Sequence, residues 1–232
     1  MAETAPQTVF NLLILDESGS MESVRELTVR GFNELVQTVQ SMALEFPARK
    51  QVVGLTTFSD RSVREKLFMQ PAEALRPLAL ADYRPNGGTP LLDAIGQSVT
   101  KLRQTLASTG AKEYEVLVTI LTDGEENASH EFSRAAVREL IDTLKTQSWT
   151  FAYLGTDHDV TAVADKLGIA NRKAFSKDPL LMDAMFAEER ALRRQYNRKP
   201  AAERGQGSYF TLDVENEAAP AEGVAPAEGA AS

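Results

Sequence analysis

The chain has 232 residues, of which 43% are hydrophobic and 25% charged, so it can form one large globular domain with a substantial core. Its formal net charge is -8, without the excess of basic residues that general nucleic-acid binding needs. It has no cysteine, which excludes disulfides, zinc–thiolate sites and cysteine nucleophiles and fits a reducing compartment. The apolar run Val9–Leu15 is too short to span a membrane, and we expect a cytoplasmic protein without membrane insertion.

Apolar strands and amphipathic helices alternate along the chain. The pattern begins with an almost continuously apolar strand, Val9–Leu15, and a helix over Ser23–Leu44. A second apolar strand, Gln51–Phe58, and the alternating segment Val63–Met69 should pair as a hairpin. The later predicted elements are a helix over Pro90–Leu106, a strand over Tyr114–Leu121, a helix over Ser133–Thr146, a strand over Thr150–Leu154, a short helix over Val160–Leu167, an edge strand at Ala174–Phe175 and a long helix over Leu180–Asn197.

This alternation predicts an α/β fold. We expect a doubly wound, mostly parallel central sheet with one antiparallel edge strand and helices on both faces. The domain would occupy residues 1–213, with its core at about 8–197. Ala, Pro, Glu and Gly dominate residues 214–232, and we expect a disordered tail there because it can bury too little apolar surface to offset the entropy of ordering. Functional residues should follow strands directly, since ligands of such sheets bind beyond the carboxyl ends of the strands.

Oxygen-bearing side chains gather at the ends of two predicted strands and at the start of one predicted helix. Asp16, Ser18 and Ser20 follow the first strand, Thr89 precedes the helix at 90–106, and Asp123 follows the third apolar strand. The set offers carboxylates and hydroxyls without sulfur or imidazole, which suits a hard divalent cation in octahedral geometry. The sequence therefore predicts a metal site for Mg²⁺, with Mn²⁺ and Ca²⁺ as alternatives.

These residues resemble the metal-ion-dependent adhesion site of the von Willebrand factor A family, also called integrin I-type domains. The family pattern is Asp-x-Ser-x-Ser, then a distant Thr, then a distant Asp after a later strand, and all parts occur here in order. Met21 after the second Ser, together with the Gly-Gly-Thr-Pro-Leu run at 87–91, is similar to the intracellular bacterial branch. The resemblance extends from about Thr8 to Asn197 and implies a Rossmann-like fold.

The resemblance also implies how the site would work. Ser18, Ser20 and, in one state, Thr89 would coordinate the ion directly, whereas Asp16 and Asp123 would act mainly through bound waters. An open position on the ion would take an Asp or Glu carboxylate of a partner protein, so the chain would be a non-enzymatic interaction module without catalytic residues. Because Thr89 heads a helix, the resemblance further implies a switch in which helix position follows ligand occupancy.

Two other functions stay open. One is an adaptor subunit of a chelatase or AAA+ ATPase-type complex, in which the partner supplies the ATPase. The other, less favoured, is a magnesium-dependent aspartyl phosphatase. That chemistry needs a second carboxylate two residues after the first, where this chain has Ser18, and a lysine near the phosphate, which these loops lack.

Other conspicuous residues have ordinary interpretations. Trp149 and Tyr153 should pack in the sheet, Asp159 should cap the following helix, and Asp157 could contact a partner. Acids beside the cluster should form a solvated rim rather than add ligands, and the two histidines should lie at the surface: Glu17, Glu125 and Glu126, with His130 and His158. We expect a solvated helix face, or alternatively a docking patch for an acidic surface, from a basic set: Arg190, Arg193, Arg194, Arg198, Lys199 and Arg204.

Overall fold

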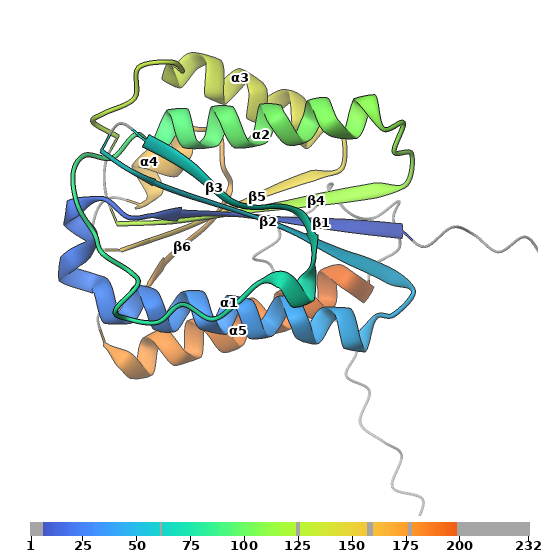
Figure 1. Cartoon of the computed structure of the whole chain (residues 1–232), viewed down its shortest axis with the longest axis horizontal. Coiled ribbons are helices and arrows are strands. Elements are labelled where there is room, and N and C mark those ends of the chain that lie inside the picture. Colours follow the sequence, from blue (N-terminus) through green and yellow to red (C-terminus); the bar gives the residue numbers. More distant parts are fainter. Residues whose placement is uncertain (1–6, 61, 124–125, 157–159, 176–177, 199–232) are drawn as a thin grey trace, which may run out of the picture.

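The computed structural model describes residues 7–60, 62–123, 126–156, 160–175 and 178–198. Within them the strands form a six-stranded sheet in the order β3-β2-β1-β4-β5-β6, and helices cover both faces (Figure 1). The strands are β1 (Gln7–Asp16), β2 (Arg49–Ser59), β3 (Ser62–Pro71), β4 (Tyr114–Thr122), β5 (Trp149–Thr156) and β6 (Asn171–Phe175). The helices are α1 (Arg25–Glu45), α2 (Leu91–Ser108), α3 (Arg134–Lys145), α4 (Val160–Lys166) and α5 (Pro179–Arg198), with 3₁₀ turns η1 (Gly19–Val24) and η2 (Ala72–Ala74).

The sheet topology confirms the predicted fold class. Every strand pairing is parallel except that of β2 with the edge strand β3, which is antiparallel. α2, α3 and α4 lie over one face, and α1 and α5 lie side by side over the other (Figure 1). The helix predicted to begin at Ser23 is preceded by a 3₁₀ turn: η1 starts at Gly19 and continues directly into α1 at Arg25. The helical region therefore begins within the Asp16–Ser20 loop, since Ser20 already lies in η1.

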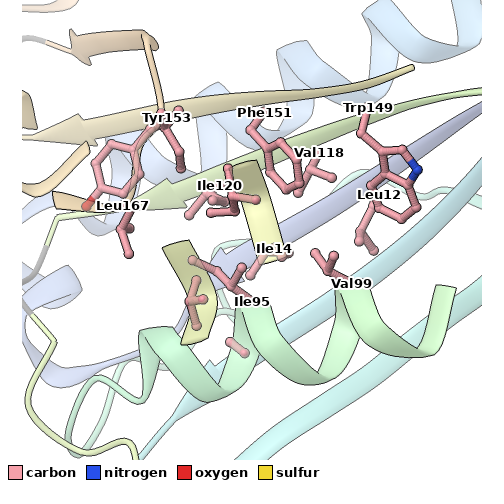
Figure 2. Close-up of a cluster of buried hydrophobic side chains, with 14 of the residues drawn as sticks. Leu12, Ile14, Ile95, Val99, Val118, Ile120, Trp149, Phe151, Tyr153 and Leu167 are labelled. Atoms are coloured by element: carbon pink, nitrogen blue, oxygen red, sulfur yellow. The ribbon is translucent and has the colours of Figure 1, made fainter. Parts of the chain in front are cut away.

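The core has two layers because the central strands are buried on both faces. Successive residues of β1 alternate between the layers, so that Leu12 and Ile14 pack toward α2 while Leu13 packs toward α1. Figure 2 shows the first layer, with Ile95 and Val99 of α2 facing the sheet. Trp149 and Tyr153 belong to the same layer and are buried, as predicted: 1% and 0% of each residue is exposed.

A long connection between β3 and α2 brings the predicted Thr89 loop to the carboxyl edge of the sheet. Only η2 gives this segment regular structure, and side chains of α1 hold it in place. Asn33 donates to the carbonyl oxygen of Leu78 at 3.0 Å and accepts from its N–H at 2.7 Å. Arg25 donates to the carbonyl oxygen of Tyr83 at 2.8 Å. The path of the connection is thus set by polar contacts with α1.

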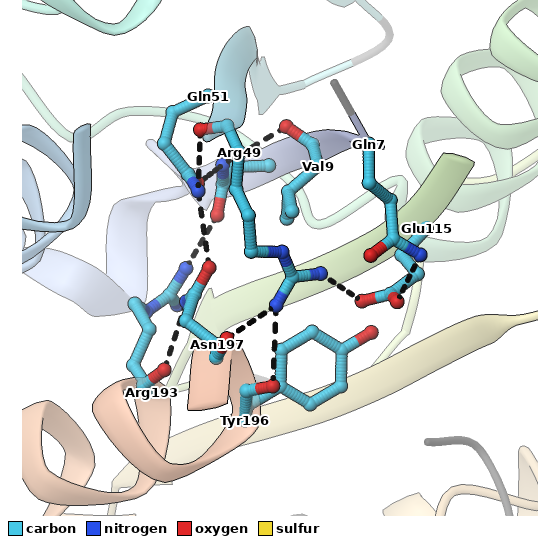
Figure 3. Close-up of polar contacts among 9 residues, drawn as sticks. Gln7, Val9, Arg49, Gln51, Glu115, Arg193, Tyr196 and Asn197 are labelled. Carbon is cyan, nitrogen blue, oxygen red and sulfur yellow. Dashed lines mark hydrogen bonds and ion pairs between the residues drawn. The ribbon is translucent and has the colours of Figure 1, made fainter. Parts of the chain in front are cut away.

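Buried polar side chains join α5 to the sheet (Figure 3). Arg193 is 1% exposed and donates to the side chains of Glu189 at 2.9 Å, Asn11 at 2.7 Å and Thr119 at 3.2 Å. Asn11 and Thr119 lie in the middle of β1 and β4, two central strands. The predicted solvated face is therefore wrong for Arg193, because its charge is neutralised by Glu189 and its donors are satisfied by the sheet.

The same network closes the carboxyl-terminal end of α5. Arg49 of β2 donates to the carbonyl oxygen of Asn197 at 2.7 Å and to the carboxylate of Glu115 at 2.7 Å (Figure 3). Gln51 donates to the Asn197 side chain at 3.0 Å. The cation of Arg49 interacts favourably with the negative end of the α5 dipole. The last turn of α5 is thus fastened to β2 as well as to the central strands.

The neighbouring arginines of α5 are also paired. Arg190 forms an ion pair with Glu34 of α1, and Arg194 forms a bidentate hydrogen-bonded pair with Glu45. The hydrogen bond from Arg194 holds the pKa of the Glu45 carboxyl below its usual range. Of the predicted basic face within the described ranges, Arg198 is exposed, and the paired Arg190 and Arg194 keep 36% and 41% of their side chains exposed. The charges of α5 serve mainly to attach it to α1 and the sheet.

Several predictions fall on residues that the structure does not describe. They concern the tail at 214–232 and these single residues: Glu125, Asp157, His158, Asp159, Lys199 and Arg204. The boundaries of the domain at its carboxyl-terminal side therefore stay a prediction. Among the described helices, none is both long and apolar enough to cross a membrane.

Candidate metal centre

The three predicted loops meet at the carboxyl edge of the sheet. β1 and β4 are parallel neighbours, so the loops that follow them begin side by side. The third loop, before α2, is bonded to the first: the Gly19 N–H donates to the Gly87 carbonyl oxygen at 2.9 Å, and the Asn86 N–H donates to the Glu17 carbonyl oxygen at 2.9 Å. The structure thus places all five predicted metal ligands at one edge of the sheet, with Asp16 at the end of β1 and Ser20 in η1.

Asp16 is the buried anchor of this edge. Asp16 is 0% exposed. One of its carboxylate oxygens accepts a hydrogen bond from the Ser18 N–H at 2.7 Å, and the other accepts one from the Thr122 hydroxyl at 2.5 Å. Burial raises the pKa of Asp16 to about 6, an effect to which the nearby charge of Asp123 adds and which the hydrogen bonds oppose. The Tyr83 hydroxyl donates to the Asp16 carbonyl oxygen, so side chain and backbone are both held. Asp16 therefore shapes the turn that carries Ser18.

Hydroxyls connect the first loop to Asp123. The Ser18 and Ser20 hydroxyl oxygens lie 3.2 Å apart, and the Ser20 hydroxyl donates to the Asp123 carboxylate at 2.7 Å. Ser18 is buried, whereas Ser20 is exposed. The Ser20 hydroxyl consequently lies within hydrogen-bond reach of both Ser18 and Asp123, and the cluster opens to solvent at Ser20.

Thr89 lies beside this cluster on the turn that starts α2. It is 3% exposed, and its main chain is bonded to Asn127, whose side-chain oxygen accepts the Thr89 N–H at 2.8 Å. In the described part of the chain, no hydrogen bond joins the Thr89 hydroxyl to the other four predicted ligands. Gly87 makes this approach possible, because its φ is +75° and a Cβ atom there would lie 2.6 Å from the Cβ of Asp60. The tight loop packing explains why glycine precedes Thr89.

The predicted rim of solvated acids is wrong for the two acids that the structure describes. Glu17 accepts from Arg64 at 2.8 Å, and its side chain is 12% exposed. Glu126 accepts the Leu92 N–H of α2 at 2.9 Å and the Ser129 N–H at 2.7 Å. Glu126 therefore caps the first turn of α2, a role typical of an acid at a helix amino terminus. His130 is exposed, as predicted.

Asp93 is a site-supporting residue that the sequence did not single out. It lies in the first turn of α2, is 6% exposed, and accepts the N–H groups of His130 at 2.8 Å, Glu131 at 2.9 Å and Phe132 at 2.8 Å. The Phe132 ring packs on Gly96, where an added Cβ would lie 2.3 Å from the ring. The available signal was an acid three residues after the Gly-Gly-Thr-Pro run, among the apolar residues that begin the helix, since a carboxylate buried there requires partners.

The donor set at this edge fits a hard divalent cation. It combines two carboxylates with three hydroxyls, and the buried carboxylate of Asp16 lies near a second acid that raises its pKa. A cation would relieve that repulsion between carboxylates. Within the described ranges, no group of three or more His, Asp or Glu side chains is placed to hold a metal ion, so such a site would rely on hydroxyl oxygens.

A sequence model of the von Willebrand factor type A domain matches residues 12–182. No curated protein matches the sequence. Among solved structures, the chain is similar to the pilus adhesin SpaC of Lactobacillus rhamnosus GG, with a TM-score of 0.57 and 15% identity over 80% of this chain and 30% of that one. It is also similar to the manganese-loaded TRAP protein of Plasmodium vivax, with a TM-score of 0.52 and 16% identity over 79% of this chain and 74% of that one.

A third similar structure is proximal thread matrix protein 1 of the mussel byssus, with a zinc-occupied MIDAS motif. Its TM-score is 0.53, with 16% identity over 78% of this chain and 46% of that one. The chain thus spans about a third of the pilus adhesin and less than half of the mussel protein. At these identities the likeness establishes the fold.

Proposed function

Because the chain belongs to the von Willebrand factor type A domain family, we propose that it is a protein-interaction module that holds a divalent cation at this edge and binds an acidic group of a partner through it. The observation that carries the proposal is the oxygen cluster: the Ser20 hydroxyl lies within hydrogen-bond reach of Ser18 and Asp123, and the buried Asp16 holds the Ser18 turn. Thr89 would complete the set from the start of α2.

Each residue of the cluster has a distinct part in this proposal. Ser18, Ser20 and Thr89 would offer hydroxyl oxygens to the ion, and Asp16 would hold the Ser18 turn through the hydrogen bond to the Ser18 N–H. Asp123 already accepts from Ser20 and would balance the charge of the ion. When bound, a hard cation supplies an open coordination position that favours a carboxylate oxygen.

We propose Mg²⁺ as the ion, with Mn²⁺ and Ca²⁺ as alternatives. Oxygen-only ligands and the small number of carboxylates favour Mg²⁺ or Mn²⁺. The manganese-loaded and zinc-occupied structures among the similar proteins support a divalent ion without selecting one for this chain. A cytoplasmic location and a bacterial origin stay predictions from the sequence.

Of the two alternative functions, one is compatible with this proposal and the other is not. An adaptor role beside an AAA+ ATPase would use the same metal-held carboxylate and is a special case of the proposal. An aspartyl phosphatase would need an acid at the position of Ser18, whose hydroxyl instead lies beside that of Ser20. We therefore propose a non-enzymatic module, and turnover of a generic phosphomonoester would contradict it.

The test uses metal titration and partner capture. Calorimetry should detect Mg²⁺ or Mn²⁺ binding by the wild type and its loss or severe weakening in Ser20→Ala and Asp123→Asn. Ser23→Ala is the matched control, because Ser23 is an exposed serine on the same turn outside the cluster. Partners captured on the immobilised wild type should be released by chelator and not retained by Asp123→Asn. Equal retention with chelator, or no metal binding at millimolar concentration, would refute the proposal.

A further inference from the structure

We propose that Asn127 is the positioning residue for Thr89, joining the Thr89 turn and the segment at 126–132 into one rigid unit that presents the Thr89 hydroxyl to the ion. The inference rests on the proposed function, because it concerns a residue that would act through a ligand of the same site. Asn127 itself is an exposed residue outside the five predicted ligands.

Asn127 binds the main chain of Thr89 from both sides. Its side-chain oxygen accepts the Thr89 N–H at 2.8 Å, and its own N–H donates to the Thr89 carbonyl oxygen at 3.2 Å. The approach is close, since a Cβ atom at Gly88 would lie 3.0 Å from the Asn127 side-chain oxygen and 2.9 Å from the Cβ of Ala128. Two hydrogen bonds on adjacent peptide groups fix both the position and the orientation of Thr89.

Asn127 can do this because the segment that carries it is fastened to α2. Glu126 accepts the Leu92 N–H at 2.9 Å, and the Ser129 hydroxyl accepts the Asp93 N–H at 3.1 Å. In return, the buried Asp93 carboxylate accepts N–H groups from the segment that follows Ser129. The helix start and the segment therefore cap each other, and Asn127 lies between these two sets of bonds. An asparagine held so firmly can impose a geometry on Thr89.

The first loop is attached to this unit by fewer contacts. The Gly19 N–H donates to the Gly87 carbonyl oxygen, and the Asn86 N–H donates to the Glu17 carbonyl oxygen. The Ser20 hydroxyl joins the same loop to Asp123, which lies outside this unit. The cluster thus consists of the Asp16–Ser20 loop with Asp123 on one side and the Asn127-linked unit on the other. Ion binding would join these two parts, and its strength should depend on how well Asn127 holds Thr89.

A double-mutant cycle tests whether Asn127 acts through Thr89. Mn²⁺ binding is measured from the electron paramagnetic resonance signal of free Mn²⁺ for wild type, Asn127→Ala, Thr89→Ala and the double variant. We expect Asn127→Ala to weaken Mn²⁺ binding about threefold to tenfold in the wild-type background, the range for one lost hydrogen bond, and less than about twofold when Thr89 is already alanine. His130→Ala is the control, since His130 is an exposed residue of the same segment whose side chain makes none of the bonds that hold Thr89 or fasten the segment to α2.

Amide exchange in the metal-free protein gives a second reading. Asn127→Ala should speed exchange of the Thr89 amide about tenfold or more, whereas His130→Ala should leave exchange of that amide unchanged. Equal losses of Mn²⁺ affinity in both backgrounds, or unchanged Thr89 exchange, would overturn the inference alone. A wild type that binds no Mn²⁺ would overturn the proposed function, and with it this role of Asn127.

Discussion

Replacing Arg193 with alanine should lower the free energy of unfolding by about 3–5 kcal/mol, the range for removing one partner of a buried ion pair. Arg193 and Glu189 are 1% and 2% exposed, so the carboxylate would stay buried after its cation is gone. The change would also remove the donors that reach Asn11 at 2.7 Å and Thr119 at 3.2 Å. The desolvated carboxylate is the largest part of the expected loss, because water cannot replace the guanidinium in a packed interior.

Two further variants separate this mechanism from a general loss of helix contacts. Arg194→Ala removes the adjacent arginine of the same helix, whose ion pair with Glu45 is exposed, and should cost far less. The double variant Glu189→Leu/Arg193→Met should recover part of the loss, because it replaces the ion pair with apolar side chains of similar volume. Both comparisons keep the helix and its length unchanged.

Urea unfolding followed by tryptophan fluorescence measures these differences. Trp149 is the only tryptophan of the chain and is 1% exposed, so its emission reports loss of the core. Midpoints should be compared at equal slope, since a changed slope would indicate a different unfolded or folded state. The reasoning is refuted if Arg193→Ala is no less stable than Arg194→Ala, or if the double variant is less stable than Arg193→Ala.

Three other predictions concern the site and its support. In the presence of chelator, the free energy of unfolding of the wild type relative to Asp16→Asn should fall by up to about 3 kcal/mol as pH rises from about 4 to 7. Folding raises the pKa of Asp16 from 3.8 to about 6, so the folded state binds the proton more tightly. Parallel urea titrations that show the same stability difference at every pH would contradict this. Gly96→Ala should destabilise the fold by about 1–3 kcal/mol despite the better helix propensity of alanine, because the added Cβ would overlap the Phe132 ring. In thermal unfolding, Phe132→Leu should rescue part of this loss, and an unchanged melting temperature for Gly96→Ala would contradict the packing argument. Mg²⁺ at 100 times its dissociation constant should stabilise the wild type by about 2.7 kcal/mol and leave Asp123→Asn nearly unaffected in the same assay, so equal shifts would place the ion elsewhere.

Local chemistry in the sequence was enough to predict the class of fold and to place the candidate ligands at one edge of the sheet. Continuously apolar strands such as Val9–Leu15 occur where a strand is covered on both faces, and the structure places β1 in the centre of a parallel sheet. Asp16 and Asp123 could be assigned to one edge because parallel strands end together. These inferences needed only periodicity, residue type and position relative to a strand end.

The roles of charged side chains depended on what packs against them. The sequence pattern around Arg193 is that of an exposed helix face, yet the helix lies on a sheet whose buried face carries Asn11 and Thr119. A polar residue in the middle of an apolar strand was a signal that a partner must exist, but it could not identify a residue far along the chain.

The support of the candidate site was likewise decided by tertiary structure. Nothing adjacent in sequence tells whether Glu126 faces solvent or caps α2, because its partner Leu92 belongs to another element. The sequence by itself determined which oxygens are available at the sheet edge, since strand ends and residue types are local properties. Only the packing of distant segments decided that Asn127 holds Thr89, because a hydrogen bond between two loops depends on where the whole sheet brings them.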